Sequence, residues 1–480
     1  MEPVLLRPLL LWIRKKIDDL LSKEFQKLSF HDRNAINEEM HGVRVLAPEE
    51  SPELLEDSLN KLSVELRRLR EHHRQHRDST AGSAYDTACS LEESYIHTDK
   101  FRLRFLRTEL MNPILAAERL VTFLDRAVEF YGEKVLHRPV RLEDLGKDGL
   151  ELLRSGDYQP LPFRDRTGRR IIAFVNNFGL CFPIHVRIKV IYYLHWVLTE
   201  DVETQRKGLV GIHWWPCSAS KRSNVPIPFS DAAKGAKLYA GHPARVTAIH
   251  VCLPNSPNFA QFRSILALGL SKETRYRFKV HKGEGLIVQY SLHGYGIPVE
   301  LLPVTETGNV KTANLKQWIK LRKFRERTSS TTANSEVPIV VDCPGLKDVI
   351  FRVGDSYFRH PGNVWFRGCI EAKYDAFENA SSEEKERIVC DIVDGILNSD
   401  GHFLEWGRDP KWWIVVKDRG AMRLKVLGAF RNHRRRVKGH WNAQEVQSNT
   451  DKFVNQDGRK RQKLDVGDDN GSSCFYKCLS

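Results

Sequence analysis

The amino-acid sequence predicts an α/β protein with a helical bundle at its start, a mixed and largely parallel sheet in the middle, and a separate small α+β domain. Three observations lead to this fold class. Apolar residues recur at helical spacing as far as residue 132, short apolar runs then alternate with helical segments, and another apolar block follows a polar stretch near residue 330. Strands that alternate with helices are typical of parallel sheets.

The first 77 residues predict a charged helical arm. Leu5, Leu9 and Ile13 recur at helical spacing beside Arg14 and Lys15. We expect these helices to pack on the rest of the protein. A helix lying in a membrane surface is the alternative, because basic residues flank the apolar ones. Residues 78–90 are rich in Ser, Thr, Ala and Gly and predict a linker.

Helices also open the segment 91–327, which is expected to fold as one domain. Phe101 and Phe105 belong to one apolar helix surface. Asn112 is expected to cap the next helix, with Pro113 in its first turn and Gly132 at its end. This pattern predicts a short helical bundle.

Three apolar runs in the same segment predict the strands of the sheet, at 171–175, 209–212 and 246–251. Because these runs are nearly continuous in apolar character, both faces of the sheet should be covered. The intervening helices can cover one face. Few obvious helices are left for the other.

The segment 91–327 resembles a CRAL-TRIO (Sec14-like) lipid-binding domain in a series of short motifs that follow one another in the family's order. These are FRLRFLR at 101–107, AAERL at 116–120, DRTGRR at 165–170, HPARV at 242–246, LSKET at 270–274, and YGIPVELLP at 295–303 with Gly308. Together they cover nearly half of the chain.

The resemblance implies a pocket whose floor is the sheet and whose cover is a gating helix over a hydrophobic ligand. An apolar stripe at 259–270 is compatible with that helix, although an ordinary core helix would show the same stripe. The candidate lipid contacts are Phe174, Ile212, Trp214, Ala248, His250, Phe259, Phe262, Ile265, Leu266, Leu270 and Arg277.

The chain departs from the family where an inositol headgroup would bind. Phosphatidylinositol-binding members commonly carry an acidic residue after the proline of the HPARV motif, and a basic residue after the gating helix. Here the first position is Ala244, while Arg277 fits the second. We expect Arg277 to face the polar end of the ligand, with a surface arginine as the alternative.

The sequence does not predict an enzyme. It holds no G-x-S-x-G, H-E-x-x-H or G-x-x-x-x-G-K-[ST] motif, and His213 and His250 are read as structural histidines. No cofactor and no metal are expected. Nine cysteines without a C-x-x-C pair indicate a reduced, cytoplasmic protein, with nuclear or peripheral membrane association as alternatives. Apolar runs are too short for a membrane span.

After a linker at 328–342, residues 343–436 predict a small α+β domain. Ser381 and Glu384 have the spacing of a capping box before a helix, and 403–406 with 412–416 predict a strand pair. Its segments at 348–354, 360–367, 401–404 and 421–431 are similar to an uncharacterised domain of microalgal proteins. That resemblance implies no activity.

The tail at 437–480 has little apolar content and is expected to be disordered. The 75 Lys and Arg against 61 Asp and Glu give a net charge of +14, which favours anionic partners. Candidate phosphate contacts are Arg367, Arg431, Arg434 and Arg435, and a solvated basic face is the alternative.

Two functions follow from these patterns. The first is non-enzymatic binding or transfer of a phospholipid or other small hydrophobic molecule, with an acidic membrane surface as a further partner. The alternative is a nuclear regulatory protein whose C-terminal domain binds nucleic acid or protein.

Overall fold

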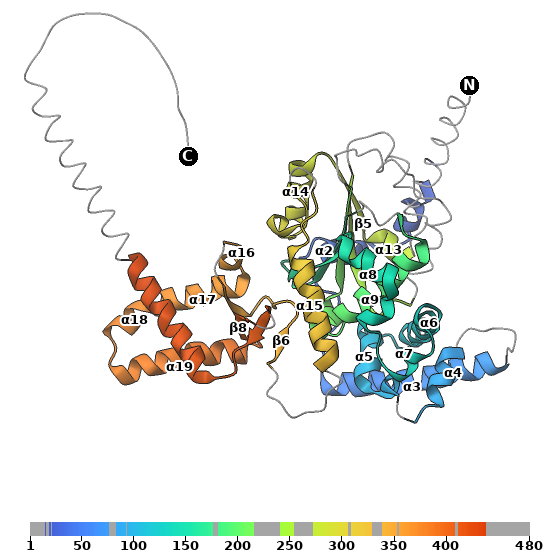
Figure 1. Cartoon of the computed structure of the whole chain (residues 1–480), viewed down its shortest axis with the longest axis horizontal. Helices are drawn as coiled ribbons and strands as arrows, with labels where there is room; N and C mark the ends of the chain where they lie inside the picture. The colour runs from blue at the N-terminus through green and yellow to red at the C-terminus, as the bar shows by residue number, and fades with distance from the viewer. Residues whose placement is uncertain are drawn as a thin grey trace, which may run out of the picture. The chain divides into compact units, whose positions relative to one another are not determined.

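A computed structural model describes residues 15, 19–20, 22–75, 83–92, 94–175, 181–215, 241–253, 272–305, 309–328, 338–352, 355–408 and 411–437. The chain forms two compact units (Figure 1). The first comprises Met1–Asn363 with Asp400–Val415, and the second comprises Val364–Ser399 with Val416–Ser480. Most of the tail expected at 437–480 lies outside the described residues.

The first unit begins with a helical bundle. Its helices are α3 (Pro52–Gln75), α4 (Ser83–Cys89), α5 (Asp99–Thr108), α6 (Pro113–Tyr131) and α7 (Lys134–His137), with a 3₁₀ turn at Tyr95–His97. The preceding helix α2 (Phe30–Met40) packs beside β4. The predicted ends of α6 are confirmed. The side chain of Asn112 accepts hydrogen bonds from the N–H groups of Ile114 and Leu115, and Gly132 ends the helix at a φ of 81°.

Two expected boundaries in this region differ from the structure. Leu62 and Leu66 of α3 are buried in the same core cluster as α5 and α6, so this part of residues 1–77 belongs to the bundle. The linker expected at 78–90 contains α4, in which Ala84 and Ala88 are buried. Small residues let a helix approach its neighbours closely, and composition alone does not distinguish that role from a linker.

The sheet of the first unit has five strands in the order β1-β2-β3-β4-β5. They are β1 (Tyr158–Arg164), β2 (Arg170–Val175), β3 (Leu209–Trp214), β4 (Val246–Leu253) and β5 (Phe278–Lys282). The β1–β2 pair is antiparallel and the other three pairs are parallel. The prediction of an α/β fold with a mixed, largely parallel sheet is confirmed.

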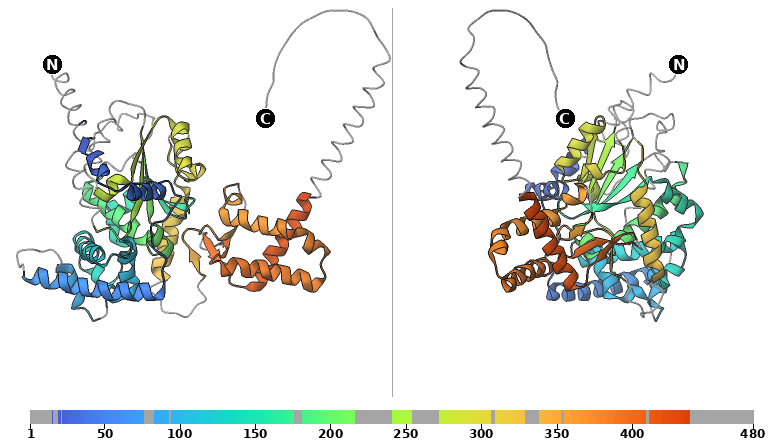
Figure 2. Two further views of the ribbon diagram at one scale, coloured as in Figure 1. Left: turned by 180° about the vertical axis from the view of Figure 1, so that it is seen from behind. Right: turned by 60° about the vertical axis from the view of Figure 1, so that its left-hand side comes forward.

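Further helices pack on both faces of this sheet. They are α8 (Gly146–Ser155), α9 (Ile184–Leu198), α10 (Val202–Lys207), α13 (Lys272–Tyr276), α14 (Gly285–Gly294) and α15 (Ala313–Thr328), with 3₁₀ turns at Leu142–Leu145 and Val299–Leu301. Both α8 and α9 lie on one side of the sheet and α14 lies on the other (Figure 2).

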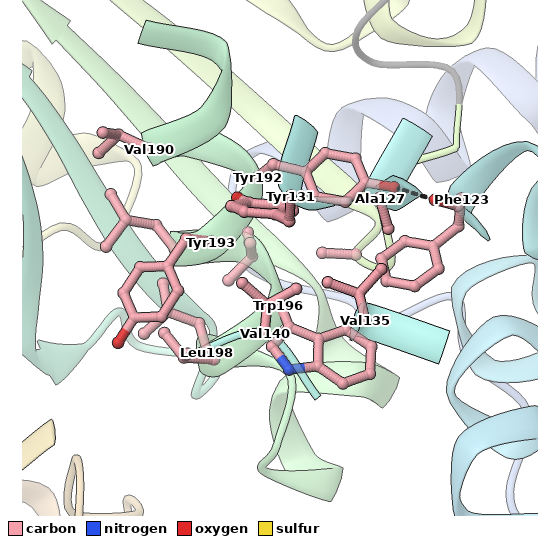
Figure 3. Close-up of a cluster of buried hydrophobic side chains, with 14 of the residues drawn as sticks. Phe123, Ala127, Tyr131, Val135, Val140, Val190, Tyr192, Tyr193, Trp196 and Leu198 are labelled. Atoms are coloured by element: carbon pink, nitrogen blue, oxygen red, sulfur yellow. Dashed lines mark hydrogen bonds between the residues drawn. The ribbon is translucent and has the colours of Figure 1, made fainter. Parts of the chain in front are cut away.

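Aromatic rings from α6 and α9 form the centre of the bundle core (Figure 3). The ring of Phe123 stacks on Tyr192 at 5.2 Å between centroids and on Trp196 at the same distance. The Tyr192 hydroxyl donates to the carbonyl oxygen of Phe123 at 2.7 Å. The stacked rings bury a large apolar area while the Tyr192 hydroxyl stays paired.

A second sheet completes the first unit, in the order β6-β9-β8-β7. Its strands are β6 (Val340–Val341), β7 (Val349–Phe351), β8 (Phe403–Trp406) and β9 (Trp413–Val415), and the helix α16 (Asp355–Phe358) follows β7. The predicted antiparallel pair, now β8 and β9, is confirmed. One strand, β6, lies within the linker expected at 328–342.

The boundary expected at residue 343 does not separate the two units. Arg170 forms an ion pair with Asp342 at 2.7 Å, and Arg164 donates to the carbonyl oxygens of Cys343 and Pro344. These contacts attach the start of the expected domain to β1 and β2. The strands of that domain therefore belong to the first unit and most of its helices to the second.

The second unit is helical. The helix α17 (Pro361–Ala372) leads into it, followed by α18 (Tyr374–Asn379), α19 (Ser382–Asn398) and helical residues 419–437. The predicted capping box of Ser381 and Glu384 is confirmed. Phe377 stacks on Phe430 at 3.9 Å and joins α18 to the last helix. No helix among the described residues of either unit is both long and apolar enough to cross a membrane.

Replacing Phe123 with Ala should lower the free energy of unfolding by about 3–5 kcal/mol, because the cavity removes the stacking contacts with Tyr192 and Trp196. Urea denaturation measures the change. The matched control is Leu115→Ala in the same helix, where the side chain is 46% exposed and a change of about 0.5 kcal/mol or less is expected. Equal midpoints for the two variants would show that the aromatic stack does not hold the bundle together.

Candidate functional site

The predicted lipid contacts on the strands point to opposite faces of the first sheet. Side chains alternate between faces along a strand. Phe174 pairs with His213, whereas Ile212 pairs with His250, so Phe174 faces away from Ile212 and His250. The register therefore does not bring Phe174, Ile212 and His250 to one face of the sheet.

Four of the predicted contacts belong to a filled core. Ile212, Trp214 and Ala248 pack in one cluster with Val288 and Leu292 of α14. The fourth, His250, is fully buried on the same face, where its Nδ1 lies 3.0 Å from Nε2 of His281. A shift of one residue in strand register moves a side chain to the other face of the sheet. The nearly continuous apolar runs of the sequence do not reveal which face each side chain takes.

The opposite face carries a continuous apolar surface, which we call the apolar floor. Its members are Phe174, Gly211, His213, Trp215, Ile249, Val251, Leu253, Phe278 and Val280. Trp215, Ile249, Val251 and Leu253 form a core cluster separate from the two larger ones, whereas Phe174 belongs to the core cluster of the bundle. The predicted gate residues Phe259, Phe262, Ile265, Leu266 and Leu270 lie outside the described residues.

One histidine on this floor is stacked between aromatic rings. The ring of His213 lies 4.5 Å from that of Phe174 at an interplanar angle of 11°, and 6.5 Å from that of Trp215. Burial lowers the pKa of His213 to about 4, so the imidazole is neutral at pH 7. The floor therefore has no charge at its centre.

Arginines gather where β2, β4 and β5 begin, and we call Arg169, Arg245 and Arg277 the arginine edge. The buried carboxylate of Glu39, on α2, lies 2.5 Å from Nη1 of Arg245 and 3.5 Å from Nε of Arg277. Glu39 is only 1% exposed. It supplies the acidic partner that the sequence lacks at Ala244.

Sequence reasoning missed Glu39 because it stands 206 residues from Arg245. No local motif signals a pair at that separation. Arg277 was expected to face the polar end of the ligand or to lie at the surface. Its side chain is 12% exposed and lies beside Glu39, and no described contact directs it toward the apolar floor.

The chain around Glu39 is bound to the arginine edge by its backbone as well. Arg169 donates to the carbonyl oxygens of Glu39 and Met40 while its Nε lies 2.6 Å from Asp165. Arg166 donates to the carbonyl oxygen of Gly42 at 3.0 Å. Gly42 has a φ of 66°, and a Cβ there would meet Arg169 at 3.0 Å, so a glycine suits this close approach.

Histidines surround Tyr295 beside this segment. His41 stacks on Tyr295 at 4.2 Å, while His250 and His281 lie 4.7 and 5.4 Å from the same ring. Burial, and then the nearby charge of Lys279, lower the pKa of His41 and of His281, the latter to about 4. All three rings are therefore neutral at pH 7.

The predicted phosphate contacts lie on the second unit. Arg434 forms a two-oxygen ion pair with Glu378, so its charge is matched. Arg431 and Arg435 are exposed on the last helix. The pKa of Arg367 is lowered first by burial and second by the positive charge of Arg436. Their role in nucleic-acid binding stays a prediction.

Comparison with protein families identifies the C-terminal part as a domain whose function is not established. Residues 348–432 match a domain of unknown function (DUF6824), which agrees with the uncharacterised domain expected there. Among solved structures, the crystal structure of Sfh5 is similar, with 13% identity, a TM-score of 0.31, and coverage of 56% of this chain and 98% of that one. No curated protein matches the chain.

Replacing Glu39 with Gln should lower the free energy of unfolding by about 3–5 kcal/mol, because Arg245 is left buried without its counter-charge. Urea denaturation measures the effect. Glu38→Gln is the matched control, since the neighbouring Glu38 pairs with Arg44 at the surface and such pairs contribute about 0–1 kcal/mol. A loss no larger than that of the control would contradict the pairing.

Acidification from pH 7.5 to pH 5 should lower the urea midpoint. The histidines around Tyr295 have pKa values below the ordinary 6.5. The unfolded chain therefore binds more protons in this range, and stability present above pH 6.5 is lost as the pH falls. The pH dependence should be weaker in His281→Gln and unchanged in His31→Gln, where the ring is exposed. Identical dependence in both variants would count against the prediction.

Proposed function

We propose that this chain binds a hydrophobic ligand, a phospholipid or another small lipid, on the apolar floor and catalyses no reaction there. The observation that carries the proposal is the floor itself. Apolar and aromatic side chains from four adjacent strands share one face, and those of β4 and β5 form with Trp215 a cluster distinct from the two larger cores. Ligand sites of this type are predominantly apolar and aromatic.

A glycine at the middle of the floor supports the same conclusion. A Cβ on Gly211 would approach Phe174 to 3.7 Å and the carbonyl oxygen of Ala248 to 4.0 Å, which are ordinary contact distances. Packing by described neighbours therefore does not demand a glycine. A glycine inside a strand weakens the strand, and such positions often mark the close approach of a ligand.

The state of His213 also fits an apolar ligand. Although burial depresses its pKa, part of its surface is still accessible, as expected for a side chain that borders internal space. Its described contacts are the rings of Phe174 and Trp215. A neutral imidazole between two rings presents an aromatic surface to a ligand.

The arginine edge indicates whether the protein offers a binding site for an anionic headgroup. Arg245 and Arg277 already contact Glu39, so an anionic headgroup would bind there only by displacing that carboxylate. The proposed binding energy comes instead from burial of apolar area, at about 25 cal/mol per Å². This favours a ligand chosen by its hydrocarbon part.

Purified full-length chain should carry lipid, and Gly211→Leu should lose most of it because the added side chain projects into the space above the floor. Mass spectrometry of solvent-extracted lipid, normalised to protein, measures the load. Gly395→Leu is the control, since a Cβ at Gly395 in α19 meets nothing within 4 Å.

Thermal denaturation would establish that both glycine variants are folded. No lipid on the unmodified chain, or an equal lipid load on a folded Gly211→Leu variant, would reject the proposed function. Nucleic acid recovered in place of lipid would favour the regulatory alternative.

A further inference from the structure

A cavity in the first unit is independent of the apolar floor. It has a volume of about 390 Å³ and lies between the end of β1, the segment 293–301 and the second sheet. This volume falls in the range of about 300–1,000 Å³ that is usual for small-molecule sites. Its lining includes Trp406, Trp412, Trp413, Tyr357 and Leu301.

The aromatic wall of this cavity is held in place by hydrogen bonds and ring contacts. The Nε1 of Trp412 donates to the carbonyl oxygen of Asp342 at 3.1 Å, and Asn363 donates to the carbonyl oxygen of Tyr357 at 2.9 Å. Trp413 meets Trp406 edge to face at 5.0 Å. The wall is therefore ordered by the protein's own contacts, which lowers the cost of binding a rigid ligand.

Cations stand at the rim of the same cavity. The guanidinium of Arg352 lies 3.6 Å from the ring centroid of Trp406 and 4.9 Å from that of Tyr357. Arg352 and Arg359 are both exposed, and neither forms an ion pair within the described part of the chain. Arg166, on the opposite wall, donates to backbone carbonyl oxygens.

Two carboxylates also line the cavity, and they do not cancel this charge. Asp165 is paired with Arg169 at 2.6 Å, and Glu300 is a single exposed carboxylate. The fourth lining arginine, Arg164, is paired with Asp201. Within the described part of the chain, three lining guanidiniums, those of Arg166, Arg352 and Arg359, form no ion pair, and they outnumber the one exposed carboxylate, that of Glu300.

A histidine, His360, also belongs to the lining. Burial lowers the pKa of this ring to about 4, so it is neutral at pH 7 and adds no charge to the cavity.

We propose that this cavity binds a small organic anion built on a flat ring, with the ring against the partly exposed Trp406 and Tyr357 and a phosphate or carboxylate at Arg352 and Arg359. Guanidinium groups bind both anions through charge-assisted hydrogen bonds. The indole wall would contribute stacking, which is worth more for a flat ring than for an alkyl chain. The site assigns a ligand-binding role to a sheet whose domain has no known activity.

Isothermal titration of the full-length chain tests the site with four probes: adenosine monophosphate, adenosine, inorganic phosphate and dodecyl phosphate. The expected order places adenosine monophosphate tightest. Adenosine, which lacks the phosphate, and inorganic phosphate, which lacks the ring, should each bind about tenfold or more weakly. The first loses the contact with the arginines and the second loses the stacking.

The variants Arg352→Ala and Arg359→Ala should weaken adenosine monophosphate about tenfold, by loss of a charge-assisted contact. Arg67→Ala is the control, since Arg67 is exposed on α3 and donates to the backbone carbonyl oxygen of Ser63. Absence of binding, or equal affinity in all three variants, would overturn the proposal. Binding of dodecyl phosphate as tight as adenosine monophosphate would overturn the flat-ring assignment.

Discussion

Buried arginines, each matched to a carboxylate, are the constraint on which this structure depends. Five such pairs join segments that are not sequence neighbours: Arg107 with Glu50, Arg164 with Asp201, Arg170 with Asp342, Arg245 with Glu39, and Arg322 with Glu200. A charge inside a protein is costly to desolvate, so each pair restricts where both of its segments can lie. The charges of these five arginines are thus structural, and the net charge of +14 does not by itself measure an anion-binding surface.

Two of these pairs position the candidate sites. The Arg245–Glu39 pair holds α2 against the start of β4, which fills the arginine edge beside the apolar floor. The Arg170–Asp342 pair fixes the position of Asp342. The carboxylate of Asp342 accepts a hydrogen bond from the indole N–H of Trp318, and its carbonyl oxygen accepts one from that of Trp412. The same anchor therefore orders the tryptophan wall of the second cavity.

Local chemistry predicted the elements that depend on near neighbours. Asn112, Gly132 and the Ser381–Glu384 box set helix ends through bonds within a few residues, and the apolar runs located three of the strands. The faces of the sheet were not predictable in this way, since one step of register moves Ile212 and Phe174 apart. The arginine edge was not predictable either, because its carboxylate partner, Glu39, comes from a distant part of the chain. Pairings across long separations depend on topology, which periodicity does not encode.

The central claim is that the apolar floor is a ligand surface, and a crystal structure of the full-length chain as purified tests it most directly. The account predicts elongated electron density above Gly211 and His213, in contact with Val251 and separate from any protein atom. Density explained by the chain's own side chains packed against those residues would contradict it. In that case the floor would be an ordinary core face.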